Sequence, residues 1–310
     1  MTIDQSSTPG SHRRQFRTSA PEGPHGTPLL GRLVTGEPYA LAFGGQGGAL
    51  WLTELAEISR DHGLEPGLTR LVNEAETLLA PVARQLRPAR SVRFDPIGWM
   101  LEDSFADSGA VDTYARPSDG LLLSFAVVMP GILLTQLAVL RALRLQGLDL
   151  RAVPPAAVLG YSQGVLAAAA IADDAAEAEL LAIAHLTGCA ATLVARRQGL
   201  VGGADDGTMI TVANVDPDEL CAIVAEMSVG LAPNESALVA VRSSRRRVVL
   251  SGPPDELKRI RVRCAEITAD QTRERAAGRR DGTVFAPVFD SLPIEVGAHH
   301  PGLADAVALV

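Results

Sequence analysis

The sequence predicts an α/β protein in which a smaller subdomain is inserted into a larger domain. Two observations lead to this prediction. Short apolar runs end in glycines and lead into helical patterns at 39–63 and 156–172, as expected where buried strands alternate with helices. Residues 207–268 follow a different pattern of short strands and two helices that both begin Pro-Asp-Glu-Leu. A chain of 310 residues suffices for one large domain or two modest ones.

The composition argues against several classes of function. A net charge of −8 argues against a nucleic-acid surface. Cys189, Cys221 and Cys264 form no CxxC pair, so they indicate neither a metal site nor a disulfide framework, and we expect reduced thiols in the cytoplasm. Residues 121–140 lack charge over a length that could cross a bilayer, but a fully buried helix gives the same pattern, and we predict no membrane segment.

The first half of the chain should begin with a disordered tail over residues 1–27, which are rich in Ser, Pro, Gly and Arg and lack periodicity. Beyond the tail, the spacing of apolar residues predicts mainly helices around one buried strand. The expected elements are a short helix at 29–36, the strand at 39–45, helices at 48–63 and 68–86, a loop at 103–119, and a long helix at about 120–146.

The central motif is Gly160-Tyr161-Ser162-Gln163-Gly164, which follows the apolar strand 156–160 and precedes helices at about 163–172 and 175–198. A serine on a sharp strand-to-helix turn projects its hydroxyl into a cleft, and the flanking positions must be small because other backbone comes very close. We therefore predict that Ser162 is a nucleophile. The alternative interpretation is a glycine-rich turn that happens to contain a serine.

Such a serine needs a base to remove its proton. Among the six histidines, His299 and His300 follow an apolar stretch that reads as a strand, and a strand end is a rigid position for a base. We favour His299 and keep His300 as the second candidate. His185 lies in the middle of a helix among Leu and Ala, where a hydrogen-bonded core or surface histidine is the expected role.

The third element is FGGQGG at 43–48, where the first strand ends and a helix begins. Glycines there would let backbone N–H groups approach a reacting carbonyl, so we predict an oxyanion hole made by the amides of Gln46 and Gln163. The alternative of a phosphate-binding loop lacks the Lys-Ser/Thr of a P-loop and the GxGxxG spacing.

The order strand, helix, strand, strand, helix over residues 207–268 is most of a ferredoxin-like unit. We expect the polar segment 269–282 to be a solvated loop, and residues 28–206 and 283–310 to form the main domain.

Three motifs in this order, FGGQG, GYSQG and GAHHP, resemble those of the acyl-CoA:acyl-carrier-protein transacylase family. The stretches SFAVVMPGILLTQLA, LVARRQG and VFAPVFDSLPIEVGAHHPGL are similar to the N-terminal acetyltransferase domain of bacterial type I fatty acid synthase. The resemblance covers about residues 30–310 and implies an α/β-hydrolase-like core with a parallel sheet, C-terminally incomplete here, plus the ferredoxin-like subdomain. The chain departs from the family at Tyr161, where His is common, and at Ala298, where Phe is common.

The resemblance implies a ping-pong acyl transfer. Ser162 would attack the acetyl-CoA thioester while His299 accepts its proton, and the phosphopantetheine thiol of an acyl carrier protein would then take the acetyl group. The family implies no metal and no tightly bound cofactor. Its partners would be a carrier-protein domain and the other domains of a homo-oligomeric cytoplasmic synthase. The implied substrate-binding residues are Gly45, Gly47, Thr187 and Asn214.

One position bears on the acyl group. Malonyl-specific members carry an Arg in a Leu-Arg-Gly stretch on the helix after the serine, and the matching stretch here is Leu186-Thr187-Gly188. A buried carboxylate without a partner is costly, and Arg196 lies too far along the helix to replace that Arg. We therefore predict preference for an uncharged starter, acetyl above all.

Three alternatives remain. The chain could be a malonyl or other acyl-CoA loading transferase of a polyketide-type synthase, or a structural fragment of a synthase. It could also be a serine hydrolase or thioesterase, which would need a triad acid between Ser162 and His299. The candidates for that acid are Asp205, Asp206, Asp216 and Asp218.

Overall fold

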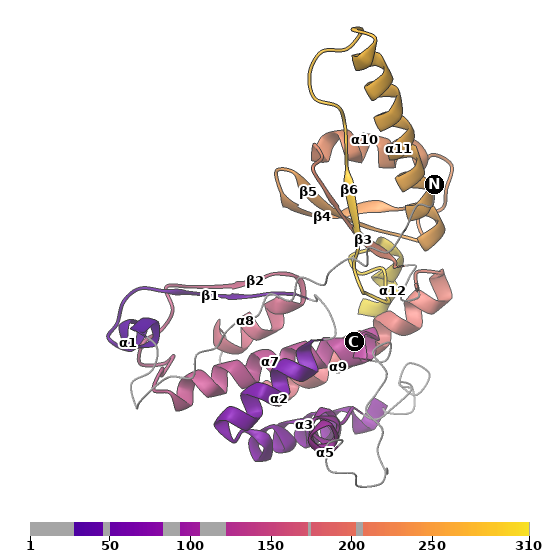
Figure 1. Ribbon diagram of the computed structural model, residues 1–310. Coiled ribbons are helices and arrows are strands. Elements are labelled where there is room, and N and C mark those ends of the chain that lie inside the picture. The colour runs from indigo at the N-terminus through magenta and orange to yellow at the C-terminus, as the bar shows by residue number, and fades with distance from the viewer. Residues whose placement is uncertain are drawn as a thin grey trace, which may run out of the picture.

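The computed structural model of the protein describes two units, which Figure 1 shows one above the other. The lower unit combines helices with a parallel pair of strands, and the upper unit is a four-stranded sheet with two helices. The mixed α/β class with a parallel sheet is thereby confirmed. The described residues are 28–45, 50–82, 94–105, 122–172, 175–202 and 207–309, so the predicted tail at 1–27 lies outside them.

Two long helices form the centre of the lower unit. α7, Phe125–Leu145, packs against α9, Glu177–Gln198. Both are apolar and long enough to span a membrane, yet 72% and 67% of their most apolar stretches are buried inside the protein, as in the core helices of soluble proteins. The surrounding helices are α1 (Pro28–Val34), α2 (Trp51–His62), α3 (Glu65–Leu79), η1 (Ala80–Val82), α5 (Pro96–Phe105), α8 (Val165–Ala172) and α12 (Ala304–Val307).

The parallel pair of strands sets up the site. β1, Ala40–Phe43, runs beside β2, Ala157–Gly160, with Phe43 paired to Gly160 at their carboxyl ends. The pairing continues one residue further, because the N–H of Tyr161 donates to the carbonyl of Phe43 over 2.9 Å. The glycine loop after β1 therefore lies directly beside the turn that contains the serine motif.

The upper unit has the ferredoxin-like order. Its antiparallel sheet runs β4-β5-β3-β6, with two helices on one face. The residues of β3 alternate: Ile210 and Val212 pack under these helices, whereas Met209 joins the core of the lower unit. The elements are β3 (Met209–Ala213), α10 (Pro217–Met227), β4 (Leu238–Ser244), β5 (Arg247–Ser251), α11 (Pro254–Ala276) and β6 (Val288–Ser291).

The expectation of a loop over 269–282 holds for residues 277–282 but is wrong for its first part, because α11 continues to Ala276. Its last turns are polar and exposed, which removes the apolar periodicity that marks a helix in sequence. Tertiary contact holds them instead: the side-chain oxygen of Gln271 accepts a hydrogen bond from the N–H of Phe285 at 2.7 Å. The assignment of residues from 283 onward to the main domain is also wrong in part, because β6 pairs with β3.

The strand expected before His299 is absent from the described residues around it. The segment is irregular and forms a single bridge, between Val201 and Val296. Its apolar residues are buried by contact with both units rather than by pairing in a sheet.

We predict that Gly188→Ala destabilises the protein. A Cβ at this position of α9 would lie 2.5 Å from the carbonyl oxygen of Phe125, so the two central helices would have to separate. We expect a loss of ~1–3 kcal/mol in the free energy of unfolding, measured by chemical denaturation. Gly31→Ala is the matched control, because a Cβ on that glycine of α1 would meet nothing within 4 Å. Equal stability of the two variants would contradict the prediction.

Candidate active site

The serine lies on a strained turn. Ser162 begins the short helix η3, Ser162–Gly164, which Tyr161 separates from the end of β2, and the φ of Ser162 is 52°. Left-handed backbone is uncommon for residues other than glycine and concentrates at functional sites. Within the described ranges, the only other such residues are Asn214 and His299, each with a φ of 62°. Ser162 and His299 are the predicted reacting pair, and Asn214 is a residue to which the resemblance assigns a substrate contact.

The glycines of the motif are required by close backbone contacts. A Cβ on Gly160 would overlap the backbone of Val165, and one on Gly164 would overlap the carbonyl of Phe43. Gly45 faces the same turn, because a Cβ there would lie 2.9 Å from the carbonyl oxygen of Tyr161. These contacts allow the strand to turn sharply into α8 and leave the serine hydroxyl outside the turn.

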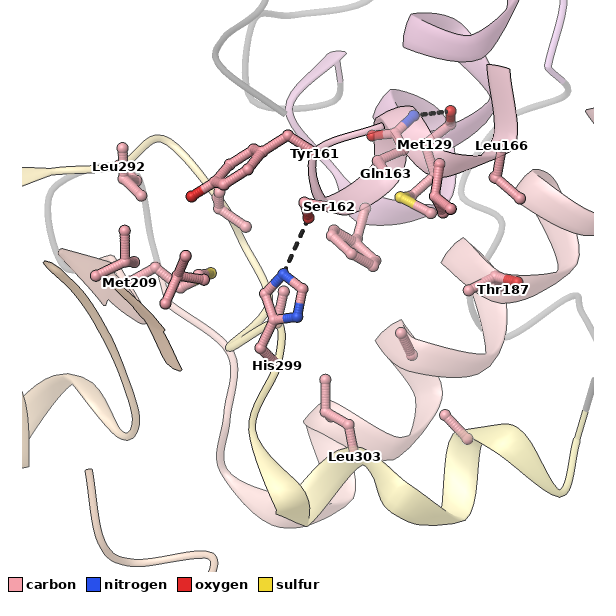
Figure 2. Close-up of a pocket in the computed structure, with 18 of the residues that line it drawn as sticks. Met129, Tyr161, Ser162, Gln163, Leu166, Thr187, Met209, Leu292, His299 and Leu303 are labelled. Carbon is pink, nitrogen blue, oxygen red and sulfur yellow. Dashed lines mark hydrogen bonds between the residues drawn. The ribbon is translucent and has the colours of Figure 1, made fainter. Parts of the chain in front are cut away.

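The structure brings Ser162 and His299 together. The Oγ of Ser162 lies 2.9 Å from Nε2 of His299, and Figure 2 shows the two side chains meeting across the middle of a cavity. A neutral imidazole at this distance can accept the hydroxyl proton as the oxygen attacks a carbonyl. The geometry therefore favours His299 over His300 as the base.

His300 has different surroundings. Its side chain is 3% exposed, its Nδ1 accepts from the N–H of Gly302 at 3.0 Å, and its Nε2 lies 2.9 Å from the carbonyl oxygen of Ser236. Because Nδ1 is the acceptor, Nε2 carries the proton and donates to Ser236. His300 therefore ties the loop to the upper unit. His185 is likewise a buried core residue, with Nδ1 3.3 Å from a carboxylate oxygen of Glu76.

Backbone and side-chain contacts on both sides hold the segment before His299. The N–H of Gly297 donates to the carbonyl of Leu200 over 3.0 Å. The carboxylate of Glu295 accepts from the N–H of Phe125 over 3.1 Å, where it also meets the positive N-terminal end of α7. Arg196 lies 3.7 Å from the same carboxylate. These contacts position the imidazole in the absence of a strand.

The cavity at Ser162 has a volume of about 550 Å³ and is mostly apolar. Its walls come from α7, α9, the end of the chain and the open face of the upper sheet. Thr187 is among the lining residues, and no Arg or Lys is, as far as the described part of the chain is concerned. The described walls of the cavity therefore offer a bound carboxylate no Arg or Lys partner.

The predicted oxyanion hole is described only in part. Gln46 and Gly47 lie outside the described residues, whereas Gly45 lies beside the serine. Gln163 is buried, and its side-chain NH₂ donates to the carbonyl of Met129, which anchors the turn to α7. The backbone N–H of Gln163 belongs to the first turn of η3, where backbone N–H groups lack helical partners. The oxyanion role stays a prediction.

Asn214 does not line the cavity of Ser162. It follows β3, donates to the carbonyl of Ala286 over 2.9 Å, and accepts from the guanidinium of Arg246. A separate cavity of about 340 Å³ lies there. The substrate contact that the resemblance implies for Asn214 stays a prediction.

No described carboxylate is hydrogen-bonded to His299 as a triad acid would be. Asp216 instead caps α10, and Asp218 lies 2.9 Å from Arg242. Asp205 and Asp206 lie outside the described residues. The described ranges also contain no group of three or more His, Cys, Asp or Glu side chains arranged to hold a metal ion.

One contact that sequence reasoning missed joins the two units at the serine. The hydroxyl of Tyr161 lies 3.2 Å from the hydroxyl of Ser243 on β4. Tyr161 is adjacent to the nucleophile, but Ser243 belongs to a distant strand, and nothing local in the sequence indicates their contact.

The comparisons with known proteins agree with this architecture. Residues 208–291, which span the upper unit from β3 to β6, match the family model of the fatty acid synthase central AT domain. No curated protein matches the chain in sequence.

Solved structures of acyltransferases are similar in fold. The malonyl CoA-acyl carrier protein transacylase of Coxiella burnetii has a TM-score of 0.55 at 18% identity, over 88% of this chain and 66% of that one. A loading acyltransferase from the avermectin modular polyketide synthase has a TM-score of 0.51 at 22% identity, over 88% of this chain and 66% of that one. A malonyl-transacylase solved with its type II polyketide synthase acyl-carrier protein has a TM-score of 0.53 at 17% identity, over 88% of this chain and 69% of that one. The chain thus spans about two thirds of these proteins and shares their fold.

We predict that substitution of His299 impairs the reactivity of Ser162, whereas substitution of His300 lowers the stability of the protein. His299→Ala should reduce the labelling of Ser162 by a fluorophosphonate probe by ~100-fold or more, because the base is lost, with little change in stability. His300→Ala should lower the free energy of unfolding by ~1–3 kcal/mol, because buried hydrogen-bonding groups lose their partner. Ser162→Ala is the control for labelling. The reverse pattern would show that His300 is the base.

Proposed function

We propose that the chain transfers an acetyl group from CoA to the phosphopantetheine thiol of an acyl carrier protein, through an acyl-serine, within a fatty acid synthase. The observation that carries the proposal is the hydrogen bond between Ser162 and His299 inside an apolar cavity whose described lining residues include no Arg or Lys. The shared fold of the acyltransferases and the family match over residues 208–291 support it.

In the first half-reaction, His299 takes the hydroxyl proton of Ser162 as Oγ attacks the thioester carbonyl. The resulting oxyanion would be stabilised by backbone amides, of which that of Gln163 is the described candidate. When the tetrahedral intermediate collapses, the C–S bond breaks, and the leaving thiolate takes the proton from His299. The products are acetyl-Ser162 and free CoA.

The second half-reaction reverses these steps with a different thiol. His299 takes the proton of the pantetheine thiol, whose sulfur attacks the acyl-serine. The C–O bond then breaks, and Oγ recovers the proton from His299. An apolar cavity favours this transfer because it limits the access of water, the competing acceptor.

The fold alone does not distinguish a fatty acid synthase from a polyketide synthase. A loading acyltransferase of a polyketide synthase would use the same serine, histidine and cavity. The family match favours the fatty acid synthase. Loading of a carrier protein from each type of synthase would separate the two functions.

We predict that acetyl-CoA acylates Ser162 faster than malonyl-CoA does. A malonyl carboxylate would lie near Thr187 without a partner, at a cost of about 10- to 100-fold in loading rate. Thr187→Arg should raise the malonyl rate by a similar factor, whereas Thr187→Val should not. The measurement is the time course of acyl-serine formation by intact mass spectrometry. Faster malonyl loading by the unchanged protein would contradict the acetyl preference.

A chase experiment separates a transferase from a hydrolase. After loading with acetyl-CoA and removal of excess CoA, pantetheine should discharge the acyl-serine at least ~100-fold faster than buffer alone, because no described carboxylate supports His299 in activating water. The discharge is followed by mass spectrometry of the protein. Equal rates with and without pantetheine would favour a hydrolase.

A further inference from the structure

The cavity extends to both sides of the reacting pair. Figure 2 shows Met129, Leu166 and Thr187 on one side of Ser162 and His299, and Met209 and Leu292 on the other. We call the first side the helix arm, because its walls come from α7, α8 and α9. A thioester carbonyl has its carbon chain and its sulfur on different sides, so a two-sided cavity suits it.

The helix arm has the features of an acyl site. Its described walls are apolar apart from Thr187 and Gln163, and the side-chain NH₂ of Gln163 donates to the carbonyl of Met129. Ala191 lies one helical turn beyond Thr187 on the same face of α9, and both side chains are small, so they leave space along the helix. Met129 and Ala191 of the helix arm are buried.

The volume exceeds what an acetyl group needs. At ~30 Å³ per non-hydrogen atom, the share of one water molecule in the liquid, an acetyl group occupies about 90 Å³ and an eight-carbon acyl group about 270 Å³. The whole cavity measures about 550 Å³. An eight-carbon chain therefore fits in about half of it, which leaves the other half for the pantetheine arm.

We propose that the helix arm accepts straight-chain saturated acyl groups of up to about eight carbons, so that Ser162 loads medium-chain acyl-CoA as well as acetyl-CoA. This proposal rests on the proposed acyl transfer at the same serine. The driving force is the burial of methylene groups, each of which favours binding by about fourfold. Longer chains in this range should therefore lower the KM for the acyl-CoA more than they raise kcat.

The first test uses the unchanged protein with acetyl-, butyryl-, hexanoyl- and octanoyl-CoA, with acyl-Ser162 measured by intact mass spectrometry. We expect octanoyl-CoA to load with a kcat/KM at least equal to that of acetyl-CoA. Loading that stops at butyryl-CoA would overturn this proposal and leave the acetyl transfer intact. Failure of every acyl-CoA to load would overturn the proposed function itself.

The second test narrows the helix arm. Ala191→Phe places a ring beside Thr187, and we expect the ratio of the octanoyl kcat/KM to the acetyl kcat/KM to fall at least ~30-fold. Ala191→Leu is a smaller change that should give an intermediate effect if the Phe variant folds poorly, as judged by thermal unfolding. Ile183→Phe is the matched control, because Ile183 is exposed on α9 and does not line the cavity. An octanoyl rate unaffected by both changes at Ala191 would overturn the placement of the chain.

Discussion

The backbone at Ser162 turns back on itself within a few residues, and two close contacts determine how it does so. The position of Gly164 against the carbonyl of Phe43 leaves no room for a side chain, and neither does that of Gly160 against Val165. A left-handed serine costs ~1–3 kcal/mol, which the surrounding bonds offset: Tyr161 pairs with Phe43, and Gln163 is anchored to Met129. The hydroxyl consequently points away from the sheet and toward the imidazole.

The imidazole of His299 belongs to a segment 137 residues after Ser162, and the neighbours of His299 hold that segment in place. His299 is exposed, so packing contributes little to its position, but the next residue is buried and bonded at both ring nitrogens. Glu295 joins the same loop to the first turn of α7. One histidine is therefore available for chemistry because the other serves the fold. The units meet here as well, through the hydroxyls of Tyr161 and Ser243.

Local sequence patterns predict some features of the fold and of the site, whereas other features depend on contacts between distant residues. The glycine spacing around Ser162 and the order of elements from β3 to α11 are local, and the structure has both. The end of α11 depends on Gln271 meeting Phe285, and the role of His300 depends on Ser236, a residue far from it in the chain. Neither contact leaves a periodic signal. The same holds for the loop before His299, whose apolar residues imitate a strand.

The alternation along β3 connects the stability of one unit to the shape of the other's cavity. Consecutive residues serve two cores, since Ile210 packs under α10 and α11 while Met209 lines the space beside the serine. A shift of this strand by one residue would exchange the two sets of side chains. Substitutions in the upper unit, far from Ser162 in the sequence, would thus change the shape of the cavity beside it. The upper unit thus forms one wall of the cavity at Ser162. The register of its strands determines which side chains face that cavity.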